Sequence, residues 1–174
     1  GPAKVAVVAS TMFGTISGST VGNIMTTGVV TIPLMKRTGY KPHVAAAIEA
    51  VASNGGQLAP PVMGATAFLI AEFLQVPYID VVMAAAVPAA IYYLVLFIQV
   101  DLIASREGLR GLPRSELPSL VRVLRIGWLF LVPLALLIWL LFWQGYQPGK
   151  AALYAAAGMA VAGVIAGGPG RDLK

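Results

Sequence analysis

The sequence has 174 residues, of which 58% are hydrophobic and only 11% are charged. A soluble domain has roughly a quarter of its residues charged, so this chain has too little charge to cover a globule in water. The composition therefore excludes an ordinary soluble domain and favours a chain whose solvent is the lipid bilayer. The net charge of +5 comes from basic clusters between apolar blocks, which is typical of membrane topology and not of nucleic-acid binding. Cysteine is absent, which excludes disulfides and thiolate metal sites.

Residues 1–42 predict a re-entrant helical hairpin followed by a basic cytoplasmic turn. Within it, Val5 to Leu34 is apolar overall, yet this stretch contains many hydroxyl side chains and four glycines. A helix that faces lipid along its whole length does not tolerate so many polar groups. Two short apolar arms that meet at a tip from Ser17 to Asn23 fit better, with the tip at membrane depth and buried in protein.

Residues 43–77 predict a discontinuous transmembrane helix. The helical pattern stops at Ala52 and is followed by Ser53-Asn54-Gly55-Gly56-Gln57-Leu58-Ala59-Pro60-Pro61. Two successive prolines cannot continue a helix, but Pro61 fits the first turn of a new one, which is expected to run from Val62 to Phe73. Glu49 lies one turn before Ser53. Both a functional role and a solvated structural role are open for it.

The remaining sequence predicts three further transmembrane helices, at residues 78–100, 126–145 and 150–168. Pro88 is expected to kink the first of them, and small residues dominate the last, where Gly163 and Gly167 form a pattern that permits close helix packing. Residues 101–125 are expected to form an amphipathic cytoplasmic connector. The fold class is therefore an all-α polytopic membrane protein.

The basic residues predict the orientation of these elements. With the hairpin returning to the side from which it enters, every Lys and Arg except Lys150 falls in the cytoplasm, as the positive-inside rule requires. A full span in place of the hairpin would put Lys36, Arg37 and Lys41 on the opposite side from the Arg106 to Arg125 cluster. The charge pattern thus favours the hairpin independently of its composition.

Two interrupted helices in succession indicate a transport site. Unwound carbonyls and hydroxyls bind cations, and the N-termini of half-helices attract anions. We predict that the hydroxyl and amide groups of Ser17, Ser19, Ser53 and Asn54 bind sodium. The complete sodium and substrate site is predicted to be Ser17, Gly18, Ser19, Asn23, Ser53, Asn54, Gly55, Gly56, Pro60 and Pro61. Ser10, on a hairpin arm, is expected to contribute much less.

Residues 3–78 resemble the large membrane subunit of the tripartite ATP-independent periplasmic (TRAP) transporters. The similar stretches are residues 7–14, 16–19, 32–40, 53–57 and 60–64; the last two resemble the TAXI-type subgroup, in which the large and small membrane subunits are often fused. The resemblance implies a sodium-coupled elevator permease of the bacterial or archaeal inner membrane. It also implies an organic-acid substrate, a periplasmic substrate-binding protein and a small membrane subunit or fused equivalent. The family's second hairpin and second broken helix are missing, so we expect a fragment that holds half of the site.

Two other functions are left open by the residues alone. An ion channel also uses unwound backbone, and a secondary carrier outside the TRAP family would share the same features. An enzyme is not expected, because the chain contains no cluster of catalytic groups, and no cofactor is expected beyond the coupling ion. The sequence does not identify the substrate.

Overall fold

A computed structural model describes residues 1–109, 132, 134–146 and 148–166. The chain divides into two compact units, Gly1–Leu117 and Pro118–Lys174. Each regular element in the described ranges is a helix, as the composition predicts.

The first two helices form a helical hairpin. Helix α1 (Pro2–Ser17) begins with a proline at a position where its missing N–H is not needed, and α2 (Thr20–Arg37) follows after two residues. Gly18 ends α1 in the left-handed conformation, with φ of 57°, and donates its N–H to the carbonyl of Gly14. The side chain of Ser19 caps α2 by accepting from the N–H of Gly22. At 1.5 Å per residue, the 16 residues of α1 extend about 24 Å, which is less than a bilayer core of about 30 Å.

The helical segment at residues 43–77 is interrupted, and its second half starts later than the sequence predicts. Helix α3 (Pro42–Asn54) leads into a short 3-10 turn, η1 (Gly55–Gln57), and α4 (Ala65–Leu74) follows. The prediction that Pro61 opens the second helix is wrong, because the backbone first turns at Met63, with φ of 56°. Gly64 is extended and caps α4.

Helix α5 (Tyr78–Arg106) is longer than the predicted span at residues 78–100 and takes in the first residues of the predicted connector. Its 29 residues include Pro88. In the described part of the chain, α5 alone is both long enough and apolar enough to cross a membrane. The rest of the connector, at residues 110–125, lies outside the described residues.

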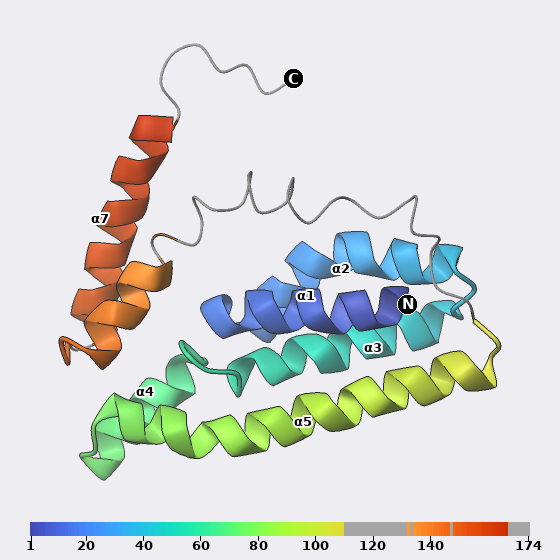
Figure 1. Cartoon of the computed structure of the whole chain (residues 1–174), viewed down its shortest axis with the longest axis horizontal. Helices are drawn as coiled ribbons and strands as arrows, with labels where there is room; N and C mark the ends of the chain where they lie inside the picture. Colours follow the sequence, from blue (N-terminus) through green and yellow to red (C-terminus); the bar gives the residue numbers. More distant parts are fainter. Residues whose placement is uncertain (110–131, 133, 147, 167–174) are drawn as a thin grey trace. The chain divides into compact units, whose positions relative to one another are not determined.

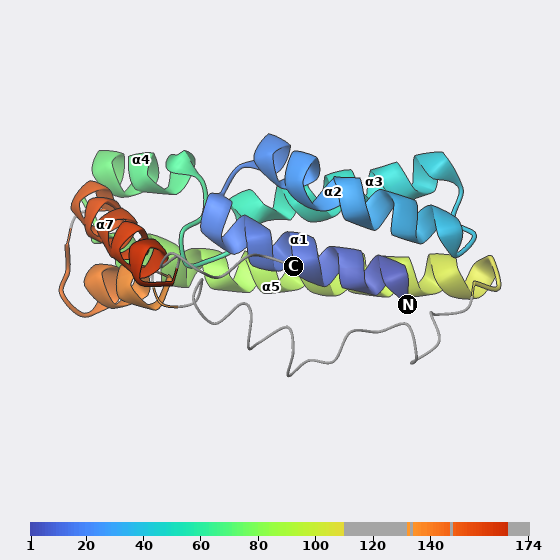
Figure 2. The same ribbon diagram turned by 90° about the horizontal axis from the view of Figure 1, so that it is seen from above.

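In the first unit, α1, α2 and α3 pack together and α5 lies along them (Figures 1 and 2). The shared core consists of Ala3, Ala6, Val7, Met35, Tyr40, Ala45, Ile48, Ala52, Leu96 and Val100. Helix α4 packs against the start of α5, beyond the three-helix group (Figure 1). Ion pairs join Lys4 to Asp101 and Lys41 to Glu107, so the outer ends of the hairpin and the end of α5 meet at one end of the unit.

The described part of the second unit contains two helical segments. Residues 134–142 are helical, and α7 (Pro148–Ala166) follows. Leu140, Ala151 and Ala155 are buried there, and the close packing expected at Gly163 and Gly167 stays a prediction. The side chains around Gly163 are not described, and residues 126–131 and 167–168 of the predicted spans lie outside the described ranges.

Because the three-helix core is built on alanines, it should not accept larger side chains. Ala45 is completely buried, whereas its neighbour Ala46 is exposed. We expect Ala45→Leu to lower the stability of the protein in detergent by about 1–3 kcal/mol through overpacking. Ala46→Leu, which adds the same atoms on the outer face, should change the thermal unfolding temperature little. Equal effects from the two substitutions would contradict this packing.

Candidate functional site

The tip of the hairpin meets the break in the discontinuous helix. The N–H of Val62 donates to the carbonyl of Thr15 at 3.1 Å, which joins the end of α1 to the turn before α4. The Gln57 side chain donates to the Thr20 hydroxyl at 2.7 Å, and that hydroxyl lies 3.4 Å from Oδ1 of Asn54. Two segments separated by more than thirty residues therefore form one local structure.

Glycines allow the two backbones to approach closely. A Cβ on Gly14 would lie 2.5 Å from the Cα of Gly56, and a Cβ on Gly56 would lie 2.7 Å from the Cα of Gly14. At the tip, a Cβ on Gly18 would lie 1.7 Å from the carbonyl oxygen of Met63. Side chains at these positions would separate the hairpin from the break, so glycine is required there.

Four helix ends meet in this region. Helices α1 and α3 end here, and α2 and α4 begin here, at Thr20 and Ala65. The C-terminal ends present carbonyl oxygens with partial negative charge, and the N-terminal ends present N–H groups with partial positive charge. Such a region offers ligands for a cation and for an anionic group side by side.

The predicted tip hydroxyls are exposed and make local contacts. Oγ of Ser17 accepts from the N–H of Ser19 at 3.4 Å, and Oγ of Ser19 accepts from Gly22 at 3.2 Å. Asn54 is also exposed, and it faces the tip through Thr20. Gly55 and Gly56 are buried at the break, and Pro60 and Pro61 are half-buried in the following turn. The structure thus brings the tip and Asn54 together.

Ser53 belongs to a different, buried group centred on Glu49. Glu49 and Ser53 are both 0% exposed, which rules out the solvated role for Glu49 that the sequence allowed. Oε1 of Glu49 accepts from Ser10 at 2.9 Å, Thr27 at 2.5 Å and Ser53 at 3.2 Å, and Oε2 accepts from Thr31 at 2.5 Å. We call Glu49 and these four residues the hydroxyl cage. In the described part of the chain, no hydrogen bond joins Ser17 or Ser19 to Ser53.

Asn23 lies inside the unit and not at the surface of the tip. It is completely buried, and its Nδ2 donates to the carbonyl of Ser10 at 2.7 Å. It shares a face of α2 with Thr27 and Thr31, because residues four apart lie one above the other on a helix. This polar stripe at intervals of four was the signal in the sequence that could have identified the cage. Ser10 also belongs to the cage; its small effect on sodium dependence stays a prediction.

Three tyrosines of α5 bind carbonyls on both sides of the break. The hydroxyl of Tyr92 donates to Val51 at 2.7 Å, and that of Tyr93 donates to Ala52 at 3.3 Å, in the last turn of α3. The hydroxyl of Tyr78 lies 2.9 Å and 2.7 Å from the carbonyls of Pro61 and Val62. The Val51 carbonyl also accepts from the N–H of Gly55, whereas the Pro61 and Val62 carbonyls lie in the turn outside the helices. Helix α5 is therefore hydrogen-bonded to the backbone on both sides of the break.

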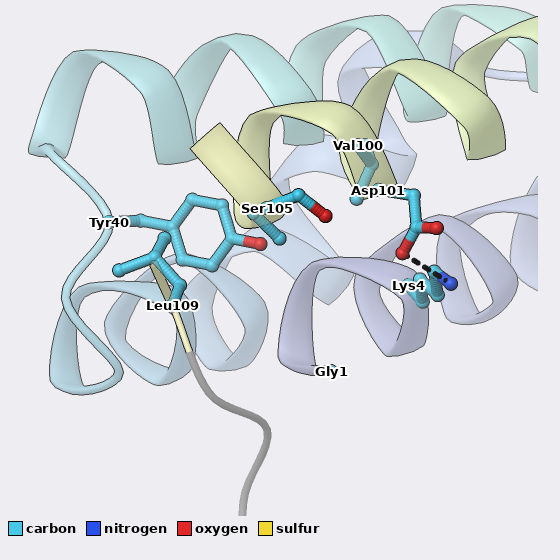
Figure 3. Close-up of a pocket in the computed structure, with 8 residues that line it drawn as sticks. Gly1, Lys4, Tyr40, Val100, Asp101, Ser105 and Leu109 are labelled. Atoms are coloured by element: carbon cyan, nitrogen blue, oxygen red, sulfur yellow. Dashed lines mark ion pairs between the residues drawn. The ribbon is translucent and has the colours of Figure 1, made fainter. Parts of the chain in front are cut away.

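A cavity of about 150 Å³ lies at the opposite end of the unit, where Lys4, Tyr40, Asp101 and Ser105 line it (Figure 3). Its charged groups neutralise each other, since Lys4 lies 2.6 Å from Asp101. Burial, and secondarily the Asp101 carboxylate, raise the pKa of the Tyr40 hydroxyl above its usual value of 10.0. These contacts explain how this end is held together and leave no free charge among them for a ligand.

The outer surface of the first unit is apolar. Among its exposed side chains are Met12, Val21, Met25, Val29 and Phe73, between 63% and 81% exposed. Water-soluble monomers rarely expose so much contiguous apolar surface. The buried polar side chains Ser10, Asn23, Thr31, Glu49 and Ser53 lie inside, in or beside the hydroxyl cage. This inversion agrees with a lipid environment.

Comparison with known families matches residues 1–172 to the family described as "Tripartite ATP-independent periplasmic transporter, DctM component". The chain belongs to this family. No curated protein and no solved structure matches the chain. The DctM components are integral inner-membrane permease subunits of a transporter family and not of an enzyme family. In general, such transporters also have a periplasmic binding protein and a small membrane subunit.

The contact between the tip and the break can be tested at Gly18. Gly18→Ala adds a Cβ that meets the Met63 carbonyl and places a side chain at φ of 57°. Gly108 has a similar φ of 62°, but a Cβ there meets nothing within 4 Å. Gly108→Ala should therefore cost only the conformational strain of about 1 kcal/mol, whereas Gly18→Ala should reduce thermal stability further and abolish uptake. Similar uptake by both variants would contradict the close contact.

Proposed function

We propose that this DctM component is the permease subunit of a sodium-coupled secondary transporter that takes up organic acids by an elevator mechanism. The observation that supports the proposal most is the meeting of the hairpin tip with the break, where four helix ends and several oxygen-bearing side chains come together. Sodium is a hard cation that prefers oxygen ligands, and in this proposal it is a co-substrate. Ser17, Ser19, Ser53 and Asn54 are its proposed side-chain ligands, together with carbonyls of the break.

The proposed substrate group is a carboxylate. The N-terminal ends of α2 and α4 lie at the tip and supply the positive end of each helix dipole, as the close approach of Gly64 to Gly18 illustrates. A bound sodium ion beside the carboxylate would neutralise it. This arrangement provides a physical reason for coupling, because each ligand improves the site for the other.

The remaining features of the proposal come from the family. A periplasmic binding protein would deliver the organic acid, and a small membrane subunit, or a fused equivalent as in the TAXI-type subgroup, would hold the permease in the bilayer. A second hairpin and a second broken helix elsewhere in the transporter would complete the site. In the elevator motion, the first unit would carry both ligands across the membrane.

The proposed topology places the end that carries Lys4, Lys36, Lys41 and Arg106 in the cytoplasm. A cysteine at Thr38 should then resist an impermeant thiol reagent added to spheroplasts, whereas a cysteine at Gln75, in the turn between α4 and α5, should react. Permeabilised cells, in which both positions are open to the reagent, provide the control. Labelling of Thr38 but not of Gln75 in spheroplasts would reverse the proposed orientation.

The proposed sodium ligands can be tested by uptake into proteoliposomes that contain the whole transporter and its binding protein. Asn54→Ala and Ser19→Ala should each raise the sodium concentration for half-maximal uptake about tenfold, as expected when one neutral ligand worth about 1.4 kcal/mol is lost. The matched control is Thr26→Ala, because Thr26 is exposed on the same hairpin and donates to the Gly22 carbonyl of its own helix. Unchanged sodium dependence in both test variants would place the site elsewhere.

The same vesicles distinguish a carrier from an ion channel. A carrier exchanges labelled substrate in a counterflow experiment, whereas a channel does not.

A further inference from the structure

Glu49 is a completely buried carboxylate held by neutral hydroxyl groups from three helices. Ser10 lies on α1, Thr27 and Thr31 lie on α2, and Ser53 lies on α3, as Glu49 does. The ion pairs of the described residues involve Asp101 and Glu107, and none involves Glu49. All four hydroxyls lie within hydrogen-bond distance of the Glu49 carboxyl oxygens, and those of Thr27 and Thr31 also lie near the backbone carbonyls of Asn23 and Thr27.

This arrangement fixes the orientation of the Ser53 hydroxyl. A serine hydroxyl has one proton and two lone pairs, and in Ser53 the proton is directed at Oε1 of Glu49, 3.2 Å away. The lone pairs therefore remain available on the other side of the oxygen. Ser53 is followed by Asn54, whose Oδ1 faces Thr20 at the tip of the hairpin. The cage is thus placed directly behind the break.

The cage also fixes the hairpin arms relative to α3. Gly28 makes room for Glu49, since a Cβ at Gly28 would lie 3.3 Å from Cγ of Glu49. Hydrogen bonds that involve a charged group are roughly twice as strong as neutral ones. One carboxylate therefore holds both arms of the hairpin and the end of α3 in a single geometry.

We propose that Glu49 is a positioning residue for the coupling cation, which it affects through Ser53. Its carboxylate holds the Ser53 proton, turns the Ser53 lone pairs toward the break, and keeps Ser53 next to the hairpin that supplies the other ligands. The inference rests on the proposed function, because it assumes that Ser53 binds sodium. It adds a residue that does not touch the cation but sets the affinity for it.

The test compares Glu49→Gln with wild type in two backgrounds, native Ser53 and Ser53→Ala, using sodium-dependent uptake by the whole transporter in proteoliposomes. Gln keeps the shape of Glu49 but forms weaker, uncharged hydrogen bonds. In the native background, Glu49→Gln should raise the half-saturating sodium concentration about fivefold, because a hydrogen bond to a charged group exceeds a neutral one by about 1 kcal/mol. In the Ser53→Ala background, it should cause no further shift.

Thr31→Val is the matched control for a purely structural role. Thr31 donates to the other oxygen of the same carboxylate at 2.5 Å, and among the described residues no hydrogen bond joins Thr31 to Ser53. The variant should lower the thermal unfolding temperature, as Glu49→Gln does, while the half-saturating sodium concentration stays within about twofold of wild type.

Three results would overturn the inference. If Glu49→Gln lowers thermal stability without changing sodium dependence while Ser53→Ala still raises the sodium requirement, the proposed function stands and the positioning role falls. If the shifts of Glu49→Gln and Ser53→Ala add, Glu49 acts independently of Ser53. If wild type shows no sodium dependence, the proposed coupling and the inference both fall.

If the Glu49→Gln variant does not assemble, Glu49→Asp is compared in the same two backgrounds. Aspartate keeps the carboxylate but is shorter by one methylene, so it should also raise the half-saturating sodium concentration only when Ser53 is present.

Discussion

An interrupted helix leaves backbone groups without partners, and in a dry environment each unsatisfied group would cost several kcal/mol. In this protein the two interruptions meet, so that the end of α1 bonds the turn before α4 through Thr15 and Val62. Contact at this distance depends on glycine on both sides, at Gly14 and Gly56. Neither interruption is stable by this means alone, which explains why the hairpin and the discontinuous helix occur as a pair.

The polar groups of the unit serve two purposes that are separated in space. Tyrosines of α5 bind the carbonyls at the outer edges of the break, at Val51, Ala52, Pro61 and Val62. The hydroxyl cage binds the two hairpin arms to α3 from within. What lies between, from Asn54 to the hairpin tip, is the part where exposed side-chain oxygens remain. The fold thus stabilises the surroundings of the candidate site and leaves the site itself polar.

Much of this could be predicted from the sequence, because glycine and proline mark interruptions by steric rules that act locally. The hairpin tip at Gly18 and the end of α3 before Gly55 follow from such rules. The start of α4 does not, since Met63 adopts a positive φ that its residue type rarely favours. The burial of Glu49 was missed because the polar spacing that indicates it has to be read on α2 and α3 together.

Polar residues recur every four positions on both α2 and α3, and this spacing decides which faces of the two helices pack together. Asn23, Thr27 and Thr31 form a polar stripe on α2, and Glu49 and Ser53 form another on α3. In a lipid solvent the two stripes can satisfy each other only by facing inward, which turns Val29 and Val30 outward to 69% and 68% exposure. The same constraint that excludes polar groups from lipid therefore places a carboxylate directly behind the break. Ser53 is the cage residue that adjoins the break. By accepting the Ser53 proton, Glu49 influences the orientation of a side chain at the candidate site.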